Sequence, residues 1–373
     1  MAIYIEELHI KSFRGIHHLA VNNLNHINII AGDNNSGKTS VLEVMLMLRN
    51  PKDFANILRI ARQRDMGLFL SGASTYENFI NLFPKNQESL DIGVKAICKN
   101  QSVKINLFGE QKVIFLEPEE INKRTPLTVR NQVQLNLNQT SMEAEGFKGK
   151  LQYQIGSEQS ENSVEIHSYS SISGREINRN NYLNMIYLAP FDHMRGNILN
   201  RILSNDSYKE VCLHILQLFS PEIIDLLILK NEDNNRPVEY VKHSTLGNMP
   251  LSTYGDGIKK VLSLANGIAQ AAGGILLIDE IETAIHSKYY NDIFTFIVKA
   301  CKQFKVQAFI TTHSIEAIDG FLATQNYSNQ DQMDDISILT FKKDVASKKT
   351  YSRVLSGRHV YSNREQFGFE VRI

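Results

Sequence analysis

The sequence predicts an α/β protein in which a mixed β-sheet core is covered by helices and carries an antiparallel β-rich insertion and a helical lobe. Three observations lead to this class. Residues 32–39 read GDNNSGKT, a complete G-x-x-x-x-G-K-[ST] pattern between a short apolar run and a helical pattern. A second apolar run, at 275–278, ends in two acidic residues. Between these two regions, short alternating runs separated by turn residues indicate antiparallel strands.

The N-terminal part of the core is expected at residues 1–90. It begins with a strand from Ile3 to Ile10, followed by a short β-branched run at Ile27–Ala31 that is typical of a buried parallel strand. From Lys38 to Leu48, apolar residues recur at helical spacing, which predicts a helix with one inner face. The phosphate-loop pattern therefore connects a strand to a helix.

The β-rich insertion is expected at residues 91–182. Five short runs predict an antiparallel meander: Val103–Leu107, Val113–Leu116, Val129–Leu137, Leu151–Ile155 and Val164–Tyr169. The polar stretch from Glu158 to Ser163 is expected to be a loop tip or mobile segment.

A helical lobe is expected at residues 183–250, and the second part of the core at 251–373. After a buried strand at Met185–Leu188, the lobe should contain helices at Tyr208–Phe219 and Ile223–Leu229. The α/β pattern then returns with two helices and three strands, at Ile258–Ala272, Ile275–Ile278, near Lys288–Phe304, Ala308–Thr311 and Ile336–Phe341.

Composition sets broad limits on the class of protein. The chain has 373 residues, 42% of them hydrophobic and 21% charged, with a formal net charge of zero. This is typical of a globular protein, and the charge gives no global reason to expect nucleic acid. No apolar stretch reaches the ~18 residues that span a bilayer, so no membrane contact is expected. Three widely spaced cysteines fit a reducing, cytoplasmic location.

Two local clusters are basic: the segment from Lys342 to Arg372, and the group Arg59, Arg62 and Arg64. Either can contact phosphates, although solvated surfaces are the favoured interpretation.

The pattern at 32–39 carries the chemistry of phosphate binding. Gly32 and Gly37 allow the tight backbone turn that aims amide groups at phosphate oxygens, and the helix N-terminus adds partial positive charge. Lys38 is expected to reach the β- and γ-phosphates, and the Thr39 hydroxyl to bind Mg²⁺. The sequence thus predicts ATP and Mg²⁺ as ligands. The remaining predicted nucleotide contacts in the loop are Asn34, Asn35, Ser36 and Ser40.

The second half of the predicted site follows two later strands. Asp279 is expected to hold Mg²⁺ beside the phosphate loop, and Glu280 to orient or deprotonate the attacking water. His313 follows the strand ending at Thr312 and is interpreted as a γ-phosphate sensor. Lys38, Glu280 and His313 are therefore the candidate catalytic residues.

The segment Leu251–Ile258 places glycines at the start of a helix. Its backbone amides can bind a second anion, or it can be a flexible turn with an N-cap. The residues alone favour neither.

Taken in order, these motifs resemble the ABC-type ATPases of the SMC/RecF/OLD group, and more narrowly the short, stand-alone OLD-like "AAA-family" ATPases. The resemblance is carried by six segments: Ile5–Ile16 with KSFRG at 11–15, the Walker A at Gly32–Ser40, the signature-like Ser252 and YGDG at 254–257, the Walker B and D-loop at Asp279–His286, the H-loop at Thr311–Ser314, and the C-terminal tail from Leu355. It leaves only about 90–180 without family landmarks.

This resemblance implies a head-to-tail nucleotide dimer. Arg14 would approach the nucleotide, and the signature residues would reach ATP bound by the other protomer. Those residues are Ser252, Gly255, Asp256 and Gly257. Homodimers or higher homo-oligomers are the expected assembly.

Three features separate this chain from parts of the group. For a Q-loop glutamine, Gln63 and Gln87 are only candidates. The insertion lacks the heptads of a coiled-coil arm. The acidic residues Asp331, Asp334 and Asp335 lie in a polar linker, and the sixty residues after His313 are too few for a TOPRIM nuclease domain.

Three functions follow from this interpretation. The first is the ATPase or sensor subunit of a bacterial defence system that works with a separate effector, such as a nuclease or toxin. The second is a RecF-like repair clamp that binds DNA when ATP closes the dimer. A third treats ATP as a structural ligand. Glu280 and His313 argue against it, because a purely structural site needs no water-activating carboxylate.

Overall fold

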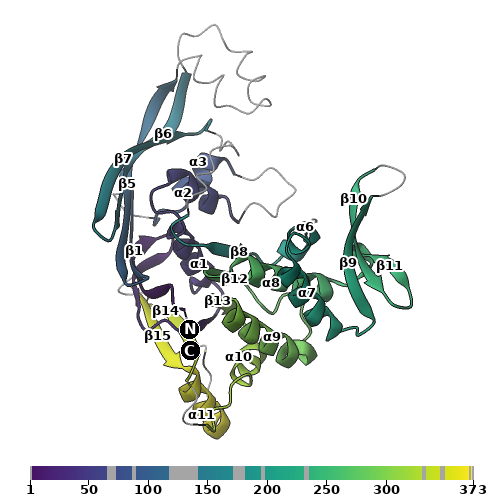
Figure 1. Ribbon diagram of the computed structural model, residues 1–373. Helices are drawn as coiled ribbons and strands as arrows, with labels where there is room; N and C mark the ends of the chain where they lie inside the picture. The colour runs from purple at the N-terminus through teal and green to yellow at the C-terminus, as the bar shows by residue number, and fades with distance from the viewer. Residues whose placement is uncertain are drawn as a thin grey trace.

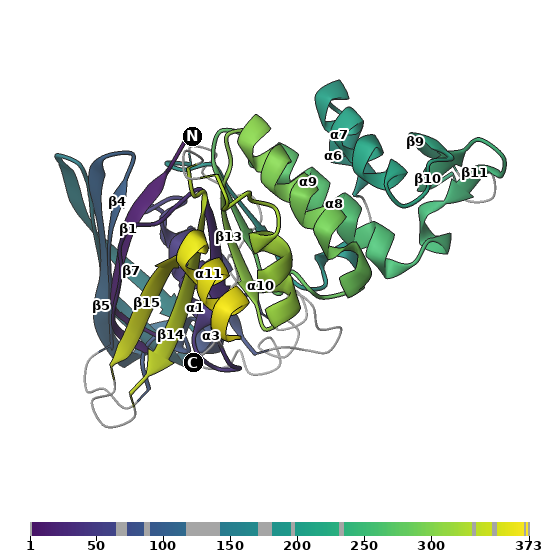
Figure 2. The same cartoon turned by 90° about the horizontal axis from the view of Figure 1, so that it is seen from below.

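Strand pairing in the computed structural model gives three sheets within the described part of the chain (Figures 1 and 2). The structure describes residues 2–64, 73–85, 90–116, 142–170, 181–194, 198–230, 235–329, 333–344, 349–368 and 371. Two sheets contain six strands each and one contains three. The strand that precedes the phosphate loop belongs to the mixed sheet, which lies in the middle of the molecule.

The core sheet has the strand order β15-β14-β3-β13-β12-β8. Five strands are parallel: β3 (Ile27–Ala31), β8 (Met185–Leu188), β12 (Ile275–Ile278), β13 (Gln307–Thr312) and β14 (Ile336–Lys343). The antiparallel edge strand is β15 (Thr350–Ser356). The predictions of strands at 27–31, 185–188 and 275–278 are confirmed to the residue.

Alternate residues of these strands enter two different hydrophobic cores. Ile29, Leu276 and Ile310 face one core, where they pack with helices α8 (Asp256–Gln270), α9 (Tyr290–Gln303) and α10 (Ile315–Leu322). An adjacent residue of each strand (Ile30, Leu277 and Phe309) faces the second core, which contains α1 (Lys38–Met47), α2 (Phe54–Ala61) and α3 (Thr75–Ile80). Burial on both faces explains why these strands are apolar throughout.

The second six-stranded sheet covers the α1 side and is antiparallel. Its order is β2 (Ile16–Val21), β1 (Ile5–Phe13), β4 (Leu90–Cys98), β5 (Gln101–Leu116), β6 (Met142–Ile155) and β7 (Glu158–His167). Figure 2 shows this sheet at one side of the molecule, with the core sheet and then the helices beyond it. The strands of the predicted insertion therefore extend a sheet that the N-terminal strands begin.

The insertion has longer strands than predicted. The runs Val103–Leu107 and Val113–Leu116 belong to one strand, β5, because it pairs continuously with β6 through the polar residues between them. Glu158–Ser163 was expected to be a loop tip and is instead the first part of β7, since the hairpin turn falls just before it, at Gly156. The predicted strand Val129–Leu137 lies outside the described residues.

The region after β8 combines helices with a small sheet. It contains the 3₁₀ turn η2 (Asp192–Met194), α6 (Leu199–Ile202), α7 (Asp206–Gln217), and the three-stranded sheet β9 (Ile223–Lys230), β10 (Pro237–His243) and β11 (Gly247–Pro250). The prediction of a helix at Ile223–Leu229 is wrong. A short Ile- and Leu-rich run fits either structure by periodicity, and here pairing with β10 forms the strand.

Gln307 joins the first antiparallel strand to the core sheet. Its buried side chain accepts from the backbone amides of Tyr4 and Ile5, at 2.9 and 2.8 Å. Its amide nitrogen donates to the carbonyls of Ile5 and Asn25, at 2.9 and 3.0 Å. One side chain thus satisfies four backbone groups where the two sheets meet.

The acidic residues before β14 have structural partners. Asp335 is buried and pairs with Lys302 at 2.6 Å, while Asp334 accepts from the Arg358 amide at 2.8 Å, near the start of α11 (Gly357–Phe367). Both lie at the amino ends of the parallel strands, whereas the phosphate loop follows a carboxyl end. Asp331 lies outside the described residues. No helix in the described ranges is both long and apolar enough to cross a membrane.

Candidate nucleotide site

The phosphate loop joins β3 to α1 through three residues with positive φ. Gly32 has φ 144°, Asn35 64° and Gly37 101°. An asparagine tolerates this region better than most residues, and glycine has no Cβ to oppose it. The Lys38 ammonium lies inside the loop, where it donates to the carbonyls of Gly32 and Asp33 at 2.7 Å each. Burial lowers the pKa of Lys38, against the opposing effect of nearby carboxylates such as Asp279.

Asp279 accepts hydrogen bonds from three hydroxyl groups. Thr39 Oγ1 lies 3.0 Å from Oδ2, Thr311 Oγ1 lies 2.6 Å from Oδ1, and the Tyr187 hydroxyl lies 3.1 Å from Oδ2. Burial, followed by the charge of Asp279, raises the pKa of Tyr187, so this phenol remains a donor. The carboxylate of Asp279 is therefore fixed beside the phosphate loop, as the sequence predicted.

The donor set of Thr39 and Asp279 fits Mg²⁺. This ion uses one or two protein oxygens together with water and substrate phosphates. No group of three or more His, Cys, Asp or Glu side chains able to hold a metal occurs among the described residues. Thr39 and Asp279 supply two protein oxygens, so water and the phosphates of a nucleotide would complete the coordination of such an ion.

Glu280 and His313 face each other beyond the ends of β12 and β13. Glu280 has φ 50°, and its amide donates to Thr311 Oγ1 at 2.8 Å, which turns the chain sharply after Asp279. His313 Nδ1 lies 3.3 Å from Lys38 Nζ, and Nε2 lies 3.8 Å from Glu280 Oε1. Because an ammonium can only donate, this contact assigns the imidazole proton to Nε2, the nitrogen that faces Glu280.

Arg14 lies beside the loop and pairs with Glu43, a fully buried carboxylate on α1. The Arg14 Nε to Glu43 Oε2 distance is 2.8 Å. Arg64 Nε contacts the other oxygen of Glu43 at 2.8 Å, and its Nη2 donates to Ser40 Oγ at 3.1 Å. Two arginines therefore share one buried carboxylate at the side of the phosphate loop, and burial of the Glu43 charge is compensated.

A cavity of about 800 Å³ opens at this point. Its lining includes predicted nucleotide contacts and several basic side chains: Arg14, Asn35, Ser36, Gly37, Ser40, Arg64, Lys85 and Lys343. A nucleotide whose phosphates lie on the loop can extend its sugar and base into this space. Asn34 and Asp33 are exposed at the tip of the loop.

The signature-like residues form a separate, exposed surface. Ser252 lies in η3 (Leu251–Thr253), and Gly255 caps α8 without a side-chain bond. A Cβ on Gly257 would lie 3.2 Å from the Ala284 carbonyl, so this helix start packs beside the segment that follows Glu280. None of the hydrogen bonds found among the described residues links Ser252 or Gly255 to the phosphate loop. Their predicted role on another protomer's nucleotide stays a prediction.

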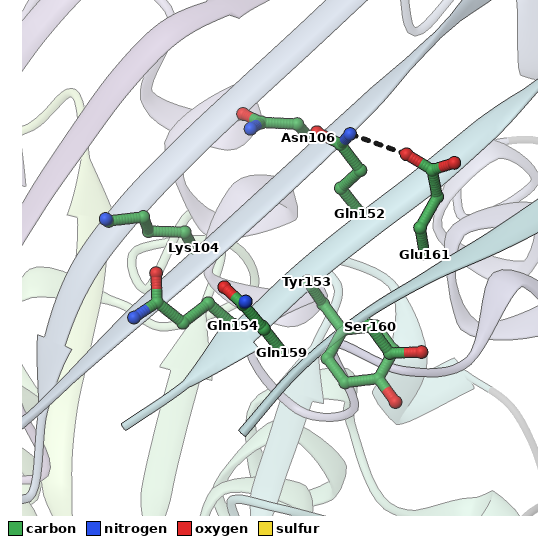
Figure 3. A pocket seen from close by; sticks show the side chains of 8 residues that line it. All are labelled: Lys104, Asn106, Gln152, Tyr153, Gln154, Gln159, Ser160 and Glu161. Carbon is green, nitrogen blue, oxygen red and sulfur yellow. Dashed lines mark hydrogen bonds between the residues drawn. The ribbon is translucent and has the colours of Figure 1, made fainter. Parts of the chain in front are cut away.

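A second hollow, of about 430 Å³, lies on the polar outer face of β5–β7 (Figure 3). It is lined by Lys104, Asn106, Gln152, Tyr153, Gln154, Gln159, Ser160 and Glu161. Gln152 and Glu161 are hydrogen-bonded to each other at 2.7 Å. None of the predicted site residues lines it.

Sequence reasoning missed several residues that the fold brings to the site. The sequence does not identify Tyr187 as a site residue, because nothing in it shows that its strand, β8, pairs with β12. Lys260, buried on α8, donates to the Pro190 carbonyl at 3.2 Å, and burial lowers its pKa to about 8. Of the two Q-loop candidates, Gln63 lies in the turn after α2 and Gln87 lies outside the described residues.

Most of the chain matches one protein family. Residues 27–319, well over half of the chain, match the family described as "AAA domain, putative AbiEii toxin, Type IV TA system". The chain belongs to this family. With its Walker motifs and fold, it is an ATPase of the ABC/SMC/RecF type.

Three relatives differ in how much of the chain they match. An ATP/GTP phosphatase of Helicobacter pylori is 22% identical over 88% of this chain and 91% of its own length. The uncharacterized protein MJECL10 of Methanocaldococcus jannaschii is 40% identical over 25% of this chain, and the match spans 42% of that protein. The DNA replication and repair protein RecF of Lachnospira eligens is 29% identical over 36% of this chain and 39% of its own length.

A solved structure shows the same fold. The SmcHead bound to the C-winged helix domain of ScpA superposes with a TM-score of 0.51, covering 95% of this chain and 98% of that one at 13% identity. The expectation of an ABC-type ATPase head is therefore confirmed for the fold.

Proposed function

We propose that the chain is a nucleotide-gated dimeric switch that binds and hydrolyses ATP. The observation that carries this proposal is the convergence of Lys38, Thr39, Asp279, Glu280 and His313 at the carboxyl ends of three neighbouring parallel strands. Ligands of α/β sheets bind at this edge. An acid, a hydroxyl, a lysine and a histidine placed there suit phosphoryl transfer to water.

Each residue has a distinct part in the proposed reaction. The amides of Gly32–Ser40 and the Lys38 ammonium hold the phosphates, and Thr39 and Asp279 would hold Mg²⁺. When bound, this ion supplies charge neutralisation for the phosphates. Glu280 accepts the proton of the attacking water, and the Nε2 proton of His313 faces the same space, where it can donate to the γ-phosphate.

The exposed signature segment supports the dimeric arrangement. Gly255 and Asp256 present the start of a 15-residue helix to solvent, and a helix N-terminus favours an anion. The resemblance to the ABC-type ATPases implies that this anion is the γ-phosphate of an ATP molecule bound by a second protomer. We infer that two chains close on two ATP molecules.

A paired-variant experiment tests this mechanism. Glu280→Gln removes the base but keeps its shape, so turnover is expected to fall by about 10²–10⁴-fold while ATP binding persists. Light scattering should then show an ATP-stabilised dimer. Adding Ser252→Arg should abolish the dimer and leave ATP binding by the monomer unchanged. Normal turnover by Glu280→Gln would overturn the assignment of the base, and a dimer unaffected by Ser252→Arg would overturn the interface.

For the cellular role, we propose the ATPase or sensor subunit of a bacterial defence system with a separate effector. The family description supports it, because it names a toxin–antitoxin system. Purification of the Glu280→Gln protein from its host, with and without ATP, should capture a nuclease or toxin. Nuclease activity by the purified chain alone would contradict a separate effector.

The similarity to RecF supports a second candidate, an ATP-dependent DNA clamp. This candidate predicts DNA affinity that appears only with ATP and falls steeply with salt, because phosphate contacts release counterions. Titrating labelled duplex DNA with the Glu280→Gln protein at two salt concentrations separates the two functions. Binding that is independent of ATP would exclude the clamp.

A further inference from the structure

The side chain of Glu282 contacts the backbone of His313, the candidate γ-phosphate sensor, and not its imidazole ring. Glu282 lies two residues after Glu280, and its Oε1 accepts a hydrogen bond from the His313 amide at 2.6 Å. Bonds of an amide to an ionised carboxylate are short and strong compared with neutral ones. This bond links two segments that are 31 residues apart in sequence.

The bond between Glu282 and His313 lies just beyond the end of β13, where the backbone no longer pairs with the core sheet. The last residue of β13 paired in the sheet is Thr312, opposite Ala31. Ser314 begins α10 by accepting from the Ala317 amide, and its own amide donates to Thr312 Oγ1. His313 therefore lies between the end of a strand and the start of a helix. Among the described residues, Glu282 is the acceptor for its amide.

Two neighbouring bonds hold the same segment at other points. The amides of Glu280 and Ile281 both bond to Thr311, through its hydroxyl at 2.8 Å and its carbonyl at 3.1 Å. Thr311 thus fixes the beginning of the turn after Asp279. Glu282 is what connects the later part of that turn to His313.

We propose that Glu282 is a positioning residue that fixes His313 between Lys38 and Glu280. By holding the His313 amide, it sets the backbone from which the imidazole reaches Lys38 with Nδ1 and faces Glu280 with Nε2. This inference rests on the proposed function, because it concerns the alignment of the sensor with the base.

The two oxygens of Glu282 allow a matched control. Oε1 makes the bond to His313, while Oε2 is buried and has no hydrogen-bond partner among the described residues. A glutamine has the same shape and can present its carbonyl oxygen to the amide. Its NH2 group would replace only Oε2. Glu282→Gln therefore keeps the positioning bond but removes the charge, and Glu282→Ala removes both.

Steady-state kinetics of these variants test the inference. Glu282→Ala is expected to lower kcat by about 10–100-fold, as loss of a supporting hydrogen bond does at other sites, with the ATP Kd changed less than about threefold. Both kcat and the ATP Kd of Glu282→Gln should stay within about threefold of the parent values. Glu316→Ala is the control, since its carboxylate accepts from Ser314 Oγ on the same loop, and it should leave kcat unchanged. Equal losses for Gln and Ala would show that the charge acts, and would overturn the inference.

A double-variant cycle separates this inference from the proposed function. If Glu282 acts through His313, Glu282→Ala should cause no further loss in a His313→Ala background. Full additivity would overturn the inference alone. Normal turnover by His313→Ala would overturn the role of His313 in the proposed mechanism, and with it the inference. If Glu282→Ala lowers the melting temperature, Glu282→Leu repeats the test with the buried volume restored.

Discussion

At the scale of single residues, the site depends on side chains that hold one another. The Asp279 carboxylate accepts from Thr39, Thr311 and Tyr187, which come from a helix and two strands. Only Thr39 was linked to Asp279 from the sequence, because a known pattern pairs them. The other two bonds need the strand order, which periodicity does not give.

Another residue, His26, carries a pH dependence. Both of its ring nitrogens are buried without a hydrogen-bond partner among the described residues, and burial lowers its pKa to about 4, against the opposing charge of Asp335. Above pH 6.5 the His26 ring is neutral in both the folded and the unfolded states. As the pH falls below 6.5, His26 becomes protonated in the unfolded state, whereas in the folded state it stays neutral down to about pH 4. The free energy of unfolding should therefore fall by about 2 kcal/mol between pH 7 and 5.

Urea unfolding at several pH values measures this effect. His26→Leu should flatten the curve between pH 7 and 5, because the carboxylates that titrate at lower pH are unchanged in both proteins. Parallel curves for the parent and the variant would show that His26 titrates normally in the folded state.

At the scale of secondary-structure elements, the paired strands β5 and β6 show how two glycines fix a packing arrangement. Gly109 and Gly149 are paired across the two strands. A Cβ on either would lie 2.4 Å from a backbone carbonyl and 2.6 Å from the Phe147 ring. The ring occupies the space that the missing side chains leave, and it packs against Phe79 and Phe83. Gly109 and Gly149 are therefore interior positions of long strands.

Gly149→Ala is expected to destabilise the protein by about 1–3 kcal/mol, because the methyl group meets backbone that cannot rotate away. Gly15→Ala, in the turn between β1 and β2 of the same sheet, is the control. Its Cβ would meet only the end of the Lys343 side chain, at 3.7 Å, so its cost should stay within about 0.5 kcal/mol. Urea midpoints of the two variants give the comparison, and equal midpoints would refute the steric argument.

At the scale of the whole molecule, the two large sheets are joined through a few polar side chains and a shared core. Gln307 satisfies four backbone groups at this junction, on Tyr4, Ile5 and Asn25, which come from the other end of the chain. Replacing it with leucine leaves those groups buried without partners. We expect Gln307→Leu to lower the free energy of unfolding by about 3 kcal/mol or more.

The exposed Gln159 on β7 offers the control for this change. Gln159→Leu makes the same chemical substitution at the surface, and its effect should stay within about 0.5 kcal/mol. Thermal unfolding of both variants, followed by circular dichroism, is the measurement. A similar melting temperature for the two would mean that the junction does not depend on Gln307.

The sequence alone determined the phosphate loop, the acidic pair at 279–280 and the strands that carry them. These features are local: a loop that cradles phosphate needs glycines, a lysine and a hydroxyl at fixed spacing, and a strand buried on both faces must be apolar throughout. Tertiary structure decided which strands are neighbours. That order placed Tyr187 and Thr311 at Asp279, and Glu282 at the His313 amide. It also made Ile223–Lys230 a strand, because an ambiguous apolar run takes the structure of the partner that it pairs with.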